Sequence, residues 1–299
     1  MEKNTQLILP LFEESTNNPT TEEKQKVVNV SSVPQRSPFR YAGGKTWLIP
    51  TIRQWLNTPT EKHLIEPFCG GASVSLTAVA ERLVATATMV ELDEDVAAVW
   101  SSILQDGERL ATRILNFNLT KETVQEVLSN EPLTIDDRAF QTIIRNRTNH
   151  GGILARGAGP LKNGENGKGI SSRWYPNTLA KRIRNIVQDK DRLTFVYGNA
   201  FDYMTPEHYT PNTYFFIDPP YTVAGKRLYT HCDVDHEEIF RRVAEMTCHY
   251  LMTYDVSDYV IELAERNNLQ WRRIPMQTTH LVKKDELLIC DNFYWYDRR

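Results

Sequence analysis

The residues with the most specific chemical pattern stand at positions 215–221, FFIDPPY. An apolar strand there would deliver Asp218 to its carboxyl end, where open α/β sheets bind their ligands. Pro219 and Pro220 stiffen the following turn and leave nearby carbonyls free to accept hydrogen bonds. An aspartate beside a free carbonyl can hold an exocyclic amino group, and the ring of Tyr221 can stack on a flat base. This stretch therefore predicts chemistry at the amino group of a nucleobase.

A second pattern, EPFCGGASVSL, predicts a strand that ends near Glu66 and turns through Gly70 into a helix. Glycine at such a turn lets the backbone approach a ligand closely, although paired glycines also occur there for packing alone. The next strand ends in VELDED about 20 residues further on, the spacing at which a carboxylate accepts hydrogen bonds from a ribose. We therefore predict that Glu91 binds a nucleoside, the alternative being a solvated strand end.

A third pattern, FRYAGGKTW, ends like a triphosphate-binding loop. That loop needs a further glycine five residues before Gly44, and this chain has Phe39 there. Pro34 and Pro38 also make the preceding residues a poor buried strand, because proline lacks the backbone donor. A triphosphate site is thus not predicted, and Lys45 is expected to bind a different group.

These residues need elements that position them, and strand-like and helical segments alternate along most of the chain. Strands are expected at 62–68, 85–93, 192–198, 213–218, 249–255, 269–276 and 285–296, and helical sequence at 70–83, 94–145, 235–246 and 257–268. Alternation of this kind predicts an α/β fold with a mixed, mostly parallel sheet flanked by helices and an antiparallel ending.

The domain organisation follows from shifts in composition. Residues 1–35 are rich in polar residues and proline, which predicts a flexible tail. Glycine density rises between 146 and 176, which indicates loops and a hairpin. We predict one domain formed by residues 36–105 and 176–299, interrupted by a helical and hairpin insert at 106–175.

The charge of the chain is unevenly distributed. The net charge is -3, yet residues 138–192 hold 12 Lys and Arg against 3 Asp and Glu. A local basic excess within an acidic protein favours a surface that faces phosphates, the alternative being solvated helix faces. The sequence has no run of about 18 apolar residues and no leader-like start, so neither a membrane span nor secretion is predicted. A cytoplasmic, nucleoid-associated protein is expected.

Taken together and in this order, the motifs RYAGGK, EPFCGG, NRTNHGGI, DPPY and KKDELLIC resemble those of the Dam-type, or D12 class, adenine-N6 DNA methyltransferases. The resemblance runs from about residue 38 to 296. It implies a Rossmann-like methyltransferase domain with a target-recognition insert, S-adenosylmethionine as cofactor, double-stranded DNA as substrate, and no metal. It also implies transfer to the N6 amino group of an adenine rotated out of the duplex, with Asp218, Pro219, Pro220 and Tyr221 as catalytic residues.

The resemblance also implies a set of cofactor contacts. Tyr41 and Lys45 would lie near the cofactor, with Lys45 at its carboxylate end, and Phe68 and Gly70 would line the cofactor turn. Glu91 would hold the ribose. Where the family often has an acidic residue near the cofactor adenine, this chain has Asn199, whose amide can also bond an adenine edge. Asp218 completes the predicted cofactor set.

DNA contacts are expected in the basic insert, because Arg pairs with guanine and Asn with adenine in the major groove. The candidates are Arg145, Arg147, Asn149, His150 and Arg156 for bases or phosphates, and Lys162, Lys168 and Arg173 for phosphates. Gly151 departs from the family pattern, which has asparagine at that position.

Other functions remain open at this level. N4-cytosine methylation uses the same acceptor pair, although serine is more usual there in place of Asp218. Adenine methylation of RNA, methylation of a protein glutamine, and a DNA-binding protein with an inactive methyltransferase fold are further alternatives. Roles in restriction-modification, in a phage or in regulation are all compatible with the chain.

The N-terminal segment QLILPLF resembles the short peptides with which bacterial replication and repair proteins bind the sliding clamp. The matching residues are Gln6, Leu7, Leu9, Leu11 and Phe12. Apolar anchors on a flexible tail suit a hydrophobic groove on a partner, and packing on the protein's own surface is the alternative. The protein is otherwise expected to be a monomer.

Overall fold

The structure is a computed structural model that describes residues 33–40, 44–58, 61–155, 157–161, 164, 167–221, 233–277 and 283–297. Tyr41, Arg156, Lys162 and the candidate clamp peptide at 6–12 lie outside these residues. Across these described ranges, no helix is both long enough and apolar enough to cross a membrane.

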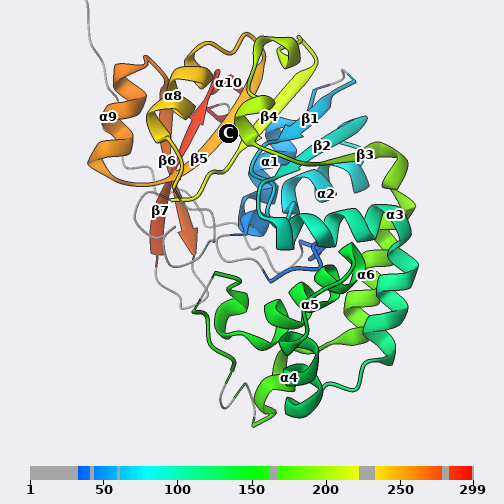
Figure 1. The fold of residues 1–299 in the computed structure, drawn as a ribbon. Helices are drawn as coiled ribbons and strands as arrows, with labels where there is room; N and C mark the ends of the chain where they lie inside the picture. The colour runs from blue at the N-terminus through cyan, green and yellow to red at the C-terminus, as the bar shows by residue number, and fades with distance from the viewer. Residues whose placement is uncertain are drawn as a thin grey trace, which may run out of the picture.

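A seven-stranded sheet in the order β3-β2-β1-β4-β5-β7-β6 forms the centre of the fold (Figure 1). The strands are β1 (His63–Glu66), β2 (Thr86–Glu91), β3 (Leu193–Tyr197), β4 (Thr213–Ile217), β5 (His249–Asp255), β6 (Gln270–Gln277) and β7 (Lys283–Cys290). Strands β1 to β5 pair in parallel, whereas β7 is antiparallel to both β5 and β6. The predicted mixed, mostly parallel sheet with an antiparallel ending is confirmed.

Helices cover both faces of the sheet. Those of the described residues are α1 (Ile49–Trp55), α2 (Ser73–Ala80), α3 (Glu94–Asn116), α4 (Lys121–Ser129), α5 (Ile135–Thr148), α6 (Pro176–Gln188), α8 (His236–Ala244), α9 (Asp258–Arg266) and α10 (Tyr294–Asp297). Buried side chains of α1, α2 and α3 join one core cluster, and those of α8 and α9 join the other. This arrangement is the layered α/β architecture that the alternating pattern predicts.

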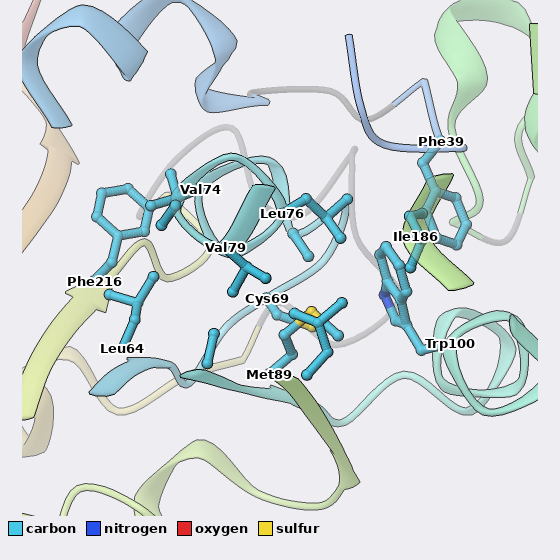
Figure 2. Close-up of a cluster of buried hydrophobic side chains, with 14 of the residues drawn as sticks. Phe39, Leu64, Cys69, Val74, Leu76, Val79, Met89, Trp100, Ile186 and Phe216 are labelled. Atoms are coloured by element: carbon cyan, nitrogen blue, oxygen red, sulfur yellow. The ribbon is translucent and has the colours of Figure 1, made fainter. Parts of the chain in front are cut away.

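Strand β4 shows how the sequence divides between the two faces, since all five of its residues are buried. Successive side chains of a strand point to opposite faces. Tyr214 and Phe216 therefore join the cluster of α1 and α2, and Phe215 and Ile217 join that of α8 and α9. Figure 2 shows Phe216 close to Leu64 and to Val74, a residue of helix α2. A strand that is buried on both faces has a continuous run of apolar residues, and the run FFI at 215–217 is such a sequence.

The helical region below the sheet in Figure 1 is formed by α4, α5, α6 and the far end of α3. Helix α3 is interrupted at Asp106, where φ is -150° and ψ is 68°. The predicted boundary at 106 falls at this interruption, and α6 begins at Pro176, where the insert was predicted to end. Helix α6 nevertheless packs against α3, and the division into domain and insert stays a prediction.

Between α5 and α6 the chain makes short turns with one antiparallel bridge, between Asn149 and Pro160. The backbone N–H of His150 donates to the carbonyl of Gly159 at 3.0 Å, and that of Leu161 donates to Thr148 at 2.8 Å. The predicted loops and hairpin are therefore present in a minimal form.

The carboxyl-terminal end of the fold differs from the sequence prediction. The last predicted strand was expected to run to residue 296, but β7 ends at Cys290 and the aromatic residues after it form α10. Phe293 and Tyr296 are buried there in the same cluster as Trp55 of α1. An alternating pattern of apolar residues over so few positions does not separate a strand from a helical turn.

Candidate active site

The carboxyl ends of β1, β2, β3 and β4 meet around a cavity of about 330 Å³. Loops at this edge supply its walls, as expected for ligand sites of open α/β sheets. Side chains and backbone from the three main motifs line it: Lys45, Glu66, Phe68, Gly70, Glu91, Asn199, Asp218 and Pro220. The structure thus brings together, around one cavity, residues that the sequence analysis had drawn from distant motifs.

The turn between β1 and α2 forms one wall of the cavity. Gly70 and Ala72 both have a positive φ, 44° and 48°, a left-handed conformation that glycine adopts without a steric penalty. The indole N–H of Trp100 donates to the carbonyl of Gly70 at 2.8 Å. This contact fixes the turn, so the backbone before α2 is held in place beside the cavity.

Glu91, at the end of β2, is oriented by three backbone donors. Its Oε2 accepts from the N–H of Gly70 at 2.8 Å, and its Oε1 accepts from Leu92 at 2.9 Å and Asp93 at 2.8 Å. Burial raises the pKa of this carboxyl to about 7. Each carboxylate oxygen can accept more than one hydrogen bond, so the fixed group can still accept from ligand hydroxyls.

Glu66 is a cavity residue that the sequence analysis did not single out. Its Oε2 accepts from the Ser75 hydroxyl at 2.5 Å and from the Ser75 backbone N–H at 2.9 Å. Burial raises the pKa of the Glu66 carboxyl to about 8. The sequence does place Glu66 directly before Pro67, at the end of a buried strand. Because ligands bind at that edge of the sheet, this position could have indicated that Glu66 belongs to the site.

Asp218 follows β4 and is held through one of its two oxygens. Oδ1 lies 2.8 Å from the Lys45 ammonium and accepts from the Thr253 hydroxyl at 2.9 Å. No donor from the described residues reaches Oδ2. Because Asp218 lines the cavity, this arrangement leaves one carboxylate oxygen available to a ligand amino group.

Lys45 is buried, with 3% of its side chain exposed. Besides Asp218, its Nζ lies 2.8 Å from the Tyr221 hydroxyl and 3.8 Å from Oε2 of Glu286. Burial lowers the pKa of this ammonium, but the two carboxylates outweigh that effect and the pKa is raised. The sequence analysis assigned Lys45 to the carboxylate of a cofactor. The structure instead surrounds the ammonium with carboxylates of the protein, so this assignment is revised.

Glu286, on β7, completes the group and was also missed as a site residue. The Tyr221 hydroxyl donates to its Oε1. The side chain is 3% exposed, and burial raises its pKa, although the nearby Lys45 opposes the shift. Its only sequence signal was its place in KKDELLIC, a stretch of the family resemblance to which no role was attached.

The remaining predicted residues near the cavity lie as follows. Phe68 and Pro220 line it, Pro219 is buried, and the Asn199 side chain also accepts from the backbone N–H of Phe201 at 3.0 Å. The structure holds no cluster of metal-ligating side chains within its described residues.

The predicted DNA contacts divide into buried and exposed residues. Arg147 and Asn149 are 4% and 8% exposed, and they donate to the carbonyls of Pro38 and Ile153. Arg145 pairs with Asp95, with Nη1 and Oδ2 2.8 Å apart. These three residues are committed to contacts within the protein, and direct base contact is no longer proposed for them. His150 and Lys168 are exposed, and Arg173 is half-buried.

Four arginines gather around the segment before the lysine loop. Burial and the charges of Arg182, Arg40 and Arg173 lower the pKa of Arg147 to about 9. Arg182 donates to the carbonyl of Ser37 at 3.0 Å. Among the described residues, no carboxylate lies within ion-pair distance of Arg40, Arg147 or Arg182. An excess of positive charge without carboxylates at these three residues favours an anionic partner.

The sheet order with its inverted β7, and the cavity with an acidic residue after β2 and Asp218 after β4, define a Rossmann-like methyltransferase. The sequence model of the D12 class N6 adenine-specific DNA methyltransferases matches residues 41–269. The chain belongs to this family. It is therefore an adenine-specific DNA methyltransferase, and S-adenosylmethionine is its methyl donor.

Three solved structures match the chain at low sequence identity and low TM-score. A putative RNA methyltransferase from Pyrococcus horikoshii is 11% identical, with a TM-score of 0.37, covering 84% of each chain. The rRNA methyltransferase aviRa from Streptomyces viridochromogenes is 11% identical, with a TM-score of 0.37, covering 82% of each chain. A precorrin-6y methyltransferase from Geobacter metallireducens is 10% identical, with a TM-score of 0.33, covering 81% of this chain and 84% of its own. A search of the curated proteins found no significant match.

Proposed function

We propose that the chain methylates N6 of an adenine rotated out of double-stranded DNA, with Asp218 and the Pro219 carbonyl holding the amino group. The observation that carries this proposal is the environment of Asp218. Lys45 and Thr253 bind Oδ1, and the carboxylate lines the cavity beside Pro220. The oxygen Oδ2 can therefore accept a hydrogen bond from an exocyclic amino group, which is an N–H donor.

The cavity has the polar groups that a zwitterionic nucleoside cofactor needs. Glu91 would accept from the ribose hydroxyls, and Asn199 would bond the adenine edge. The buried Glu66 carboxylate suits the ammonium of the methionine part, since a cation would favour its ionised form. Phe68 supplies an apolar wall. Bound S-adenosylmethionine supplies an electrophilic methyl group on its sulfonium.

The residues of the chain act by positioning and desolvation. Hydrogen bonds from the N6 amino group to Asp218 and to the Pro219 carbonyl would fix the nitrogen lone pair toward the methyl group. Correct orientation of bound reactants lowers the barrier without a covalent enzyme intermediate. Transfer of the methyl group would form an N–C bond and break an S–C bond, so the amino nitrogen would lose a proton, and Asp218 Oδ2 would be available to accept it.

The target base must leave the helix first, because N6 is paired inside a duplex, and this costs about a few kcal/mol. Stacking on an aromatic ring offsets part of that cost, at about 1–3 kcal/mol per base. Tyr221 is the proposed stacking residue. Its hydroxyl is fixed by Lys45 and Glu286, which limits the positions available to the ring.

The DNA backbone is proposed to bind at a cluster of partly exposed arginines, Arg40, Arg173 and Arg182, which surround the buried Arg147. The backbone of Arg40 is held by Asn146 through hydrogen bonds of 2.8 and 2.9 Å. A Cβ at Gly152, which also lines the cavity, would lie 2.5 Å from the Arg40 carbonyl oxygen. The cluster thus adjoins the cavity, which is where phosphates flanking an extruded base would lie.

The test is a methylation assay with purified protein, S-adenosylmethionine and matched DNA and RNA oligonucleotides, read by mass spectrometry of the nucleosides. N6-methyladenine from DNA is expected, and Asp218→Ala should abolish it while cofactor binding persists. N4-methylcytosine, a product from RNA alone, or full turnover by the Asp218→Ala variant would each overturn the proposal. Mapping the methylated sites in cellular DNA would then define the recognition sequence.

For the N-terminal segment we propose sliding-clamp binding through residues 6–12, on the sequence pattern given above. Binding of the full chain to a bacterial clamp should disappear when Gln6, Leu11 and Phe12 are replaced by alanine, with methylation of short oligonucleotides unaffected. Equal clamp binding by this variant would refute the assignment. A monomeric, cytoplasmic and nucleoid-associated protein is part of the same proposal, and light scattering tests the monomer.

A further inference from the structure

We propose that Glu286 is a positioning residue that orients Tyr221 and Lys45 for base flipping and methyl transfer. The inference rests on the proposed function, because it assigns to Glu286 the placement of the stacking ring. Three observations carry it: the topology of β7, the contacts of the carboxylate, and the cost of burying it.

The topology brings Glu286 to the ligand edge of the sheet. Strand β7 runs against its neighbours, so its first residues lie beside the last residue of β5, and Glu286 pairs with Asp255. The parallel strands end at this edge, where Asp218 follows β4. An inverted strand is what allows a residue near its beginning to reach a site built from strand ends.

The contacts join two loops that are far apart in the sequence. Oε1 of Glu286 accepts from the Tyr221 hydroxyl, and Oε2 lies 3.8 Å from the Lys45 ammonium. The Lys45 ammonium in turn contacts both the Tyr221 hydroxyl and Asp218. Glu286 therefore holds the tyrosine from the sheet, while Lys45 connects that tyrosine to the carboxylate proposed to bind N6.

The energetics argue against a role in stability alone. A buried carboxylate costs free energy unless its oxygens are paired and hydrogen-bonded. Oε2 of Glu286 has no hydrogen-bond partner in the described part of the chain. Asp218 already supplies a closer counter-charge to Lys45, so the second buried carboxylate is not needed to neutralise the ammonium. What Glu286 adds, among the described residues, is a fixed acceptor for the Tyr221 hydroxyl.

The residues around Asp218 and those around Tyr221 therefore have different roles in the site. Thr253 and Lys45 orient Asp218 toward the amino group, and Glu286 orients the Tyr221 ring toward the face of the base. Loss of Glu286 would remove the acceptor of the tyrosine hydroxyl and leave the position of the ring less restricted. The extruded base would then be held less often in the reactive position, with no change in the cofactor pocket around Glu91.

The experiment compares Glu286→Gln, Glu286→Ala, Tyr221→Phe and the double variant Glu286→Ala/Tyr221→Phe in the full chain. We measure kcat, DNA KM, cofactor Kd and the fluorescence of 2-aminopurine at the target position. Displacement of a reacting group by about 1 Å can cost about 100-fold in rate, so Glu286→Ala should lower kcat by about that factor. Glu286→Gln keeps an acceptor for the hydroxyl and should retain more activity.

Two further results distinguish positioning from a structural effect. The kcat losses of Glu286→Ala and Tyr221→Phe should not multiply in the double variant, because both remove the same hydrogen bond. Cofactor Kd should stay at the wild-type value, and the exposed neighbour Asp285→Asn should behave as wild type. Glu286→Gln covers the case in which the alanine variant fails to fold.

Wild-type kcat in both Glu286 variants, fully multiplicative losses, or loss of cofactor affinity in step with kcat would overturn the inference. Its failure is distinguishable from failure of the proposed function, because the wild-type protein would still form N6-methyladenine in DNA.

Discussion

The buried ammonium of Lys45 and the carboxylate of Asp218, which lines the cavity, form an ion pair with Nζ and Oδ1 2.8 Å apart. One residue comes from the Gly-Gly-Lys loop and the other from the Asp-Pro-Pro-Tyr turn, so the pair fastens the two most distinctive motifs to each other. The pair also gives Lys45 a role, although its loop lacks the glycine that a triphosphate-binding loop requires. Lys45 orients the proposed acceptor of the target amino group, and its ammonium also lies 3.8 Å from the buried carboxylate of Glu286.

Replacing Lys45 by methionine keeps most of the side-chain volume but removes the charge. Asp218 and Glu286 would then face each other without a cation. Leaving a buried carboxylate such as that of Glu286 without its cation costs up to about 3–5 kcal/mol. We expect a lower urea midpoint and no measurable methylation. Adding Glu286→Gln to Lys45→Met should recover part of the stability, because one uncompensated charge is removed. An unchanged urea midpoint for Lys45→Met would contradict this account of the pair.

Thr253 is expected to matter for turnover rather than for the cofactor. Thr253→Val removes the hydroxyl that donates to Asp218 and leaves the buried shape unchanged. Hydrogen bonds to charged groups contribute about 1.5–3 kcal/mol, so kcat should fall by about tenfold or more while cofactor Kd stays constant. The matched control is Thr88→Val, a buried threonine of β2 whose hydroxyl contacts His63, 3.0 Å away and outside the site. Equal kcat in the two variants would count against the role of Thr253.

The stability of the protein without cofactor should fall as the pH rises toward 8. Burial raises the pKa of Glu66 from 4.5 to about 8. Between these values the folded state keeps a proton that the unfolded state has lost, so raising the pH favours unfolding. Each such group contributes a slope of up to about 1.4 kcal/mol per pH unit. Glu91, with its pKa raised to about 7, acts in the same direction.

Chemical denaturation at several pH values measures this slope, and Glu66→Gln provides the comparison. The amide oxygen can still accept from Ser75 but carries no titrating proton. The variant should therefore show a flatter stability profile between about pH 5 and pH 8. A profile as steep as that of the wild type would show that Glu66 does not titrate as its burial indicates.

Much of the fold follows from the sequence because its strands carry local signals. The run FFI before Asp218 predicts a doubly buried strand, and the glycine turn predicts where β1 meets α2. Both motifs fix their own residues near the ligand edge, which is why Gly70, Glu91 and Asp218 could be placed in one site. Helix α1 and the final turn α10 carry weaker local patterns and were not foreseen.

Contacts within the site were less predictable, because they depend on the pairing of distant strands. Nothing near Glu286 in the sequence indicates that an inverted β7 places it beside Tyr221. From the sequence, Lys45 was predicted to bind the carboxylate of the cofactor. The sequence alone does not show that the fold places the Asp218 carboxylate beside the lysine. Arg147 and Asn149 looked like DNA contacts by residue type, and only the fold shows that both are buried against backbone carbonyls.

The arginine cluster should determine the salt dependence of DNA binding. Each phosphate contact contributes about 0.9 to the slope of log K against log salt concentration. Arg182→Gln should therefore reduce the slope by about one and weaken binding to all sequences alike. The control is Arg184→Gln on the same helix, since Arg184 is paired with Glu108, its Nη2 2.5 Å from Oε1. Fluorescence anisotropy over a salt series measures both slopes. Equal slopes for the wild type and Arg182→Gln would mean that the DNA backbone does not reach this cluster.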